Sequence, residues 1–179
     1  MRTAAIILAV ALAGCAPDWM DNGLLVRDGV ELHSGTFPRY VTTDGTMSDA
    51  LAEEAAEWWN DQVGLPLMEY TPLGASDVVV GVGYIPNPDA LGRADIDYAR
   101  DGAILGCVIT IASDYAYDRA TALQALRHEL GHCPLGLDDD PGPPVTVDLR
   151  SIMSSPLDSL GEVTDHDREI IEEMYHESL

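Results

Sequence analysis

The sequence predicts an α+β domain with a twisted mixed sheet of about five strands, an N-terminal helix and a central helix. Short runs of apolar and β-branched residues, such as Val78–Val80, alternate with turn residues and predict the strands. Two longer segments carry apolar residues at helical spacing and end at Gly or Pro. The 179 residues suffice for one domain with a sizeable core and are few for two.

The first expected strand is Phe37–Val41, and a helix follows it. Thr46-Met47-Ser48-Asp49 resembles a capping box at the start of this helix. Apolar side chains then recur on one helical face, at Met47, Leu51, Ala55 and Trp58. We interpret the adjacent Trp58 and Trp59 as core packing. Gly64–Pro66 should end the helix.

Four more strands are expected after this helix. Residues 67–70 and 77–84 are apolar enough for buried strands, and Val78–Val80 is too apolar to be exposed on both faces. Residues 91–98 and 103–112 should form a hairpin around Arg100-Asp101-Gly102.

The central helix is expected over Arg119–Cys133, which is rich in the helix formers Ala and Leu. An apolar stripe at helical spacing is formed by Leu123, Leu126 and Leu130. Asp118 suits the N-cap, and Pro134 with Gly136 should end the helix. One side of this helix should therefore pack into the core while the other faces a cleft.

The cleft side of this helix carries His128-Glu129-Leu130-Gly131-His132. Residues four apart share a helix face, so both imidazoles can present a ring nitrogen to one metal ion. Glu129 lies about 100° round the helix from His128, where it can reach a water molecule on that metal without being a ligand. This pattern is typical of zinc hydrolases. The alternative is a solvated helix face that binds no metal.

Together with Ser151-Ile152-Met153 downstream, these residues resemble the metzincin zinc proteases, and the matrixin-like bacterial members most closely. The pattern of that family is His-Glu-x-x-His-x-x-Gly-x-x-His or Asp, followed by a Met-turn. His128, Glu129 and His132 match outright, and Met153 matches the Met-turn methionine, which has a structural role only.

The flanking segments are similar to the same family. Residues 50–70 look like its first helix and the strand after it, and residues 164–175 look like its last helix. The resemblance therefore implies a metzincin-like zincin domain over residues 36–179, with a zinc-binding helix, a Met-turn and a C-terminal helix.

The chain departs from the family pattern at the third zinc ligand. The glycine, Gly136, comes one residue late, and the third histidine is replaced by the acidic run Asp138-Asp139-Asp140. Counting from Gly136 selects Asp139, whereas counting from His128 selects Asp138. We favour Asp139 because the turn at the glycine should set the return path, and aspartate is an acceptable zinc ligand. Alternatively, the three aspartates form a solvated loop or bind Ca²⁺.

The resemblance implies a zinc endopeptidase that hydrolyses proteins or peptides, with Glu129 as the general base that later protonates the leaving amine. It also implies that Gly92–Tyr98 forms the lip of the cleft, to which a peptide adds by backbone hydrogen bonds. An ordinary exposed edge is the alternative for that strand. Two other interpretations of the whole chain are a non-catalytic metzincin-like lipoprotein that acts as a binding module, and a calcium-stabilised envelope protein whose motif is incidental.

Residues 1–14 are expected to be a lipoprotein-type signal peptide. Met1-Arg2 gives a positive start, and Ala4–Ala13 is apolar but too short to span a bilayer as a stable anchor. Leu12-Ala13-Gly14-Cys15 resembles a bacterial lipoprotein signal, in which Cys15 becomes lipid-modified; an ordinary secretory peptide is the alternative. Residues 15–35 should then be the lipidated N-terminus and a tether. We expect a location in the bacterial cell envelope, held by the lipid anchor alone and facing the periplasm or the exterior.

Export leaves Cys107 and Cys133 as a pair in an oxidising compartment, where they can form a disulfide or remain two buried thiols. The formal net charge is −22, and all nine basic residues are arginine. With no cationic patch to neutralise phosphates, nucleic acid is excluded as a partner. The expected partner is a protein or peptide substrate, and we expect a monomer.

Overall fold

The computed structural model describes residues 24–72, 76–139, 152–153 and 161–178. The expected signal peptide, Cys15 and the tether up to residue 23 lie outside these residues, as do Asp140 and Ser151. Within the described ranges, no helix combines the length and the apolar character needed to cross a bilayer.

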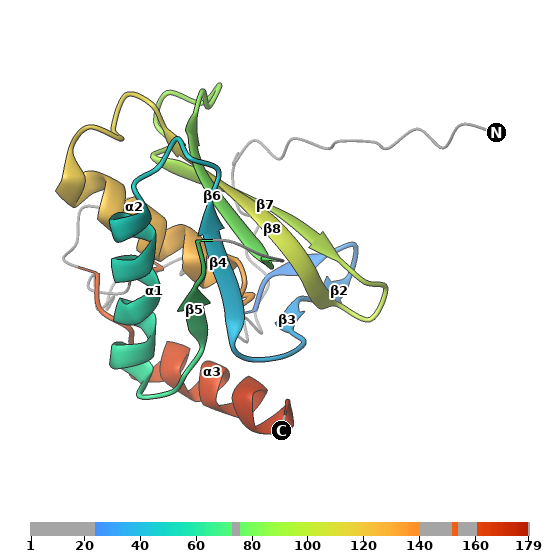
Figure 1. Ribbon diagram of the computed structural model, residues 1–179. Coiled ribbons are helices and arrows are strands. Elements are labelled where there is room, and N and C mark those ends of the chain that lie inside the picture. The colour runs from blue at the N-terminus through green and yellow to red at the C-terminus, as the bar shows by residue number, and fades with distance from the viewer. Residues whose placement is uncertain (1–23, 73–75, 140–151, 154–160, 179) are drawn as a thin grey trace, which may run out of the picture.

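The centre of the fold is a six-stranded sheet (Figure 1). Its strands are β3 (His33–Ser34), β4 (Arg39–Thr43), β5 (Met68–Tyr70), β6 (Val78–Gly83), β7 (Gly92–Tyr98) and β8 (Ala103–Ala112). The order is β3-β8-β6-β4-β5, all parallel, and β7 pairs with β8 in antiparallel fashion. The sheet is therefore mixed and mostly parallel.

All five strands expected from the sequence are present, with ends shifted by at most two residues. The strand expected at Phe37–Val41 is β4, which begins at Arg39 because Pro38 has no N–H for the ladder. The sheet also contains β3, which was not expected. Two residues are too few to produce an alternating pattern that sequence inspection could detect.

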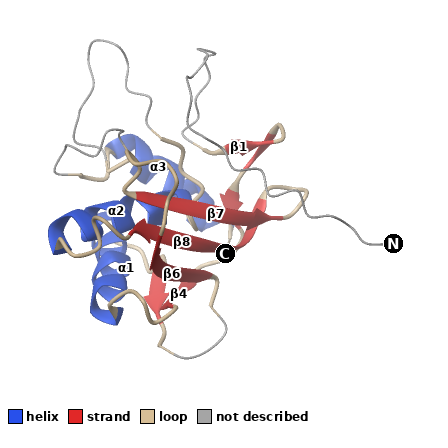
Figure 2. Ribbon diagram, turned by 90° about the horizontal axis from the view of Figure 1, so that it is seen from above, coloured by secondary structure: helices blue, strands red, loops and turns tan. Residues whose placement is uncertain are grey.

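Three helices, α1 (Asp49–Val63), α2 (Arg119–His132) and α3 (Asp165–Glu177), gather on one side of the sheet (Figure 2). The indole of Trp59 on α1 is fully buried, and its Nε1 donates to the Arg127 carbonyl on α2 at 2.9 Å. The guanidinium of Arg127 lies 4.8 Å from the centre of the Trp58 ring. Both tryptophans thus pack at the contact between the two helices, and the core role expected of Trp59 is confirmed.

The capping box expected at Thr46–Asp49 is wrong. Ser48 is the N-cap of α1, but its side chain makes no capping hydrogen bond. The Thr46 hydroxyl instead donates to Asp44 and accepts from the backbone N–H of Val82 on β6. A capping box does form at α3, where Thr164 and Asp167 exchange hydrogen bonds.

The core lies between the sheet and the helices. The apolar stripe of α2, formed by Leu123, Leu126 and Leu130, is buried. The same core cluster contains buried residues of β6 and β8, among them Val78, Val80, Ile109 and Ile111. Each fully buried Leu or Ile side chain contributes about 2 kcal/mol relative to an exposed one. This burial holds α2, and the side chains it carries, in a fixed position on the sheet.

Residues 24–34 belong to the packed domain, although composition placed them in a tether. They contain a hairpin of β1 (Val26–Arg27) and β2 (Val30–Glu31), followed by β3. Leu32 is fully buried, and Leu24 forms a bridge with Leu137 just beyond α2. Because the tether prediction rested on weak periodicity, it missed these very short strands. The packed part of the described chain therefore includes residues 24–34, which precede the domain start expected at residue 36.

Candidate metal centre

Local interactions fix both ends of α2. The Asp118 side chain caps the N-terminus by accepting from the Ala120 N–H at 3.1 Å, as expected. Cys133 is the C-cap and forms a disulfide with Cys107 on β8. The chain then reverses at Gly136, whose φ of 77° is left-handed and suits glycine. The helix is thereby joined to the sheet at the end that carries His128 and His132.

Two imidazoles on α2 face each other, with the Nε2 atoms of His128 and His132 3.0 Å apart. Each Nδ1 lies 2.8 Å from a backbone carbonyl oxygen, that of Ile152 for His128 and that of Leu137 for His132. A carbonyl oxygen only accepts, so in both rings Nδ1 is the donor. In the neutral rings each Nε2 therefore carries a lone pair, and the two lone pairs point at the same small space.

A carboxylate completes this arrangement. Asp139 Oδ1 lies 3.3 Å from His128 Nε2 and 3.5 Å from His132 Nε2. This oxygen is buried and has no directed hydrogen-bond partner among the described residues. His128, His132 and Asp139 thus form a group able to hold a metal ion. A cation at the shared point would satisfy all three electron-rich atoms at once.

The structure brings Asp139, not Asp138, to the two imidazoles. The Asp138 carboxylate accepts a hydrogen bond from the backbone N–H of Asp139 at 2.9 Å. The loop that carries both residues is bound to the N-terminal segment, because the Leu25 N–H donates to the Gly136 carbonyl at 2.7 Å. The N-terminal segment therefore helps to place the third member of the group.

Electrostatics at the group favour positive charge. Burial would lower the pKa of His132, but the adjacent Asp139 carboxylate and the charge of Glu129 outweigh it and raise that pKa to about 9. Burial would also raise the pKa of the Asp139 carboxyl, but the two facing imidazoles hold it well below its usual range. The buried site therefore holds an ionised carboxylate and favours a positive charge beside it.

Glu129 lies beside this group and is not one of its members. Its side chain is buried against Gly92 of β7. Burial raises the pKa of the Glu129 carboxyl, and the neighbouring imidazoles of His132 and His128 offset this only in part. A desolvated carboxyl group with a raised pKa, next to a metal-binding group, is suited to accept and return a proton.

Met153 is fully buried beneath α2. A Cβ at Gly131 would overlap the Met153 sulfur, so the glycine between the two histidines lets this segment approach the helix closely. The preceding residue, Ile152, supplies the carbonyl that orients His128. The segment therefore acts on the group through packing and one backbone acceptor.

The strand β7 offers an open edge next to Glu129. The Leu91 carbonyl accepts from the Ala112 N–H. Leu91 and every second residue after it therefore point their backbone N–H and C=O groups toward β8. Gly92, Ala94 and Ile96 consequently point theirs at the opposite side, where no strand of the described part of the chain pairs with them. Gly92–Tyr98 is thus an edge strand of the sheet, and its outer side is unpaired within the described residues.

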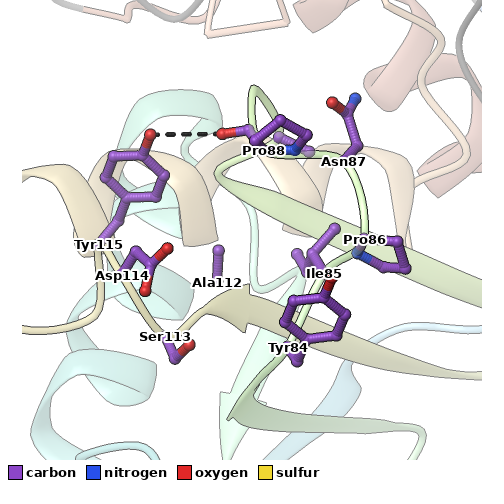
Figure 3. Close-up of a pocket in the computed structure, with 10 residues that line it drawn as sticks. Tyr84, Ile85, Pro86, Asn87, Pro88, Ala112, Ser113, Asp114 and Tyr115 are labelled. Atoms are coloured by element: carbon purple, nitrogen blue, oxygen red, sulfur yellow. Dashed lines mark hydrogen bonds between the residues drawn. The ribbon is translucent and has the colours of Figure 1, made fainter.

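An open pocket lies between the loops that precede β7 and α2 (Figure 3). Tyr84, Pro86, Pro88 and Tyr115 are among its lining residues, and the Tyr115 hydroxyl reaches the Pro88 carbonyl at 3.5 Å. None of the four residues at the candidate metal centre lines it. The pocket is separate from the metal-binding group.

Sequence inspection identified the side chains of this site but missed their backbone partners. The Leu137 and Ile152 carbonyls leave no trace in residue type. Gly92, which lies against Glu129, could have been noticed as a glycine inside a strand pattern. In comparisons with known proteins, no family model matches this chain, and no curated protein does so either.

Proposed function

We propose that this protein is a zinc-dependent endopeptidase of the metzincin type. The observation that carries the proposal is the convergence of His128 Nε2, His132 Nε2 and Asp139 Oδ1, with both Nδ1 atoms held by carbonyls. This arrangement leaves each ring in the tautomer that a metal requires. The buried Glu129 beside it supplies the group that proton transfer needs.

The distances and the donor types favour zinc. Four ligands at about 2.0–2.1 Å from a tetrahedral ion lie about 3.3–3.4 Å from one another. The three distances between the donor atoms are 3.0, 3.3 and 3.5 Å. Calcium prefers six to eight oxygen ligands, whereas two imidazoles and one carboxylate suit zinc. Three protein ligands also leave a fourth position free, as in catalytic rather than structural sites.

When bound, zinc would supply Lewis acidity, which acidifies water and polarises a carbonyl group. The chain itself supplies the proton transfers. Glu129, desolvated on α2, takes a proton from the attacking water and delivers it to the leaving amine. The open edge at Gly92, Ala94 and Ile96 can align a peptide by backbone hydrogen bonds beside that carboxylate. Burial of Glu129 excludes the bulk water that would otherwise compete for the proton.

We further propose that the protein acts in the bacterial cell envelope, anchored through Cys15. The sequence around Cys15 supports this, and the disulfide between Cys107 and Cys133 supports export independently. Structural disulfides persist in oxidising compartments and are rare in reducing ones. The proposed substrates are accordingly proteins or peptides at the envelope.

The proposal is tested with purified, zinc-loaded protein and an unfolded polypeptide substrate. We expect cleavage into peptides, loss of cleavage with 1,10-phenanthroline, and recovery on addition of Zn²⁺. The isomer 1,7-phenanthroline cannot chelate and serves as the control, which should leave cleavage intact. Stoichiometric zinc without cleavage of any polypeptide would instead indicate a metal-binding module that is not an enzyme.

A further inference from the structure

We infer that Gly92 positions the catalytic glutamate: the missing side chain at Gly92 forms the space that the Glu129 carboxylate occupies. This inference rests on the proposed function, because it assigns the reason why Glu129 is aimed at the metal-binding group. A Cβ built at Gly92 would lie 2.7 Å from both Cγ and Oε1 of Glu129 and 3.0 Å from its Cδ. No side chain larger than a hydrogen fits there without moving the carboxylate.

The backbone does not explain the glycine. Gly92 is absent from the glycines with positive φ, in contrast to Gly29, Gly45 and Gly64. Those three have open space around the Cβ position, so their conformation accounts for them. Gly92 lies in a strand, where glycine is unfavourable for entropy and packing. Space for Glu129, rather than conformational freedom, is therefore the property that Gly92 provides.

Glu129 has several rotatable bonds, and a flexible carboxylate placed about 1 Å from its productive position can lose about 100-fold in rate. Because Gly92 leaves room for the Glu129 side chain, β7 sets the position of the general base.

The test is Gly92→Ala in the full-length, zinc-loaded protein. We expect kcat for peptide cleavage to fall about 100-fold, with KM nearly unchanged and zinc stoichiometry equal to that of the wild type. A general loss of folding would lower zinc content as well, so the combination of retained zinc and lost kcat is diagnostic. Wild-type kcat in the Gly92→Ala protein would overturn the inference.

Gly81→Ala is the matched control. Gly81 lies within β6 of the same sheet, and a Cβ there would also collide with a carboxylate, that of Asp44. Asp44 belongs to the turn before α1 and has no part in the metal-binding group. We expect Gly81→Ala to lower the melting temperature while kcat per folded molecule stays at the wild-type value.

A thermal double-mutant cycle gives a readout that is independent of activity. Gly92→Ala should lower the melting temperature of the wild type, and it should do so much less in a Glu129→Ala background, because the colliding side chain is gone. Gly81→Ala should lower the melting temperature by the same amount in the wild-type and Glu129→Ala backgrounds. If Gly92→Ala lowered the melting temperature equally in both backgrounds, the inference would be refuted. If the wild type proved to cleave nothing, the proposed function would fail, yet this cycle would still decide the role of Gly92.

Discussion

Replacing Glu129 with Gln is expected to lower kcat for peptide cleavage by about 1000-fold while zinc remains bound. Glutamine fills the same volume in the space beside Gly92. It cannot take up a proton from water. Since Glu129 lies outside the group formed by His128, His132 and Asp139, zinc content should not change. Steady-state kinetics with metal analysis of the same preparation measures both quantities.

Glu129→Asp is the companion variant. It keeps the carboxylate but shortens the side chain by one methylene group. Its kcat for peptide cleavage should therefore lie below that of the wild type and above that of Glu129→Gln. Cleavage by Glu129→Gln at the wild-type rate would remove Glu129 from the mechanism and leave the metal site without its proton acceptor.

Replacing Asp139 with Ala is expected to weaken zinc binding by more than about 100-fold, the upper range for loss of an outer-shell partner. The change removes the only carboxylate in the described metal-binding group and leaves the two Nε2 atoms 3.0 Å apart without it. Cleavage activity should be lost with the metal and return in part at high Zn²⁺ concentration. Competition with a chromophoric chelator gives the zinc affinity directly.

Asp138→Ala is the matched control for this change. The two residues are adjacent, carry the same charge, and lie in the same loop, but the Asp138 carboxylate accepts from the Asp139 N–H instead of facing the imidazoles. We therefore expect near-normal zinc affinity in Asp138→Ala. The opposite pattern, with zinc lost in Asp138→Ala and kept in Asp139→Ala, would reassign the third ligand.

Much of this fold could be predicted because its elements are long enough to show a period. The strand expected at residues 103–112 appears with the same bounds, and the helix expected at residues 119–133 ends one residue earlier, at His132. Residues 24–34 show no such period, since β1, β2 and β3 have two residues each. Their burial depends on contacts with distant parts of the chain, such as Leu137, which no local pattern records.

The candidate site also has a part that local sequence predicts and a part that depends on tertiary packing. His128 and His132 are one helical turn apart, so helical geometry alone places them together. Asp139 lies beyond the turn at Gly136, so the path of the loop decides which aspartate reaches the imidazoles. Counting residues alone does not distinguish Asp138 from Asp139. The carbonyls of Leu137 and Ile152 and the space at Gly92 arise from tertiary packing, and they decide which ring nitrogens and which carboxylate face the centre.

The measurement that tests the central claim most directly is anomalous diffraction from zinc-loaded crystals on both sides of the zinc absorption edge. We predict one peak between His128 Nε2, His132 Nε2 and Asp139, at about 2.0–2.2 Å from each ligand atom. An empty site in zinc-loaded crystals, or a zinc ion held by other residues with these three turned away, would contradict the assignment.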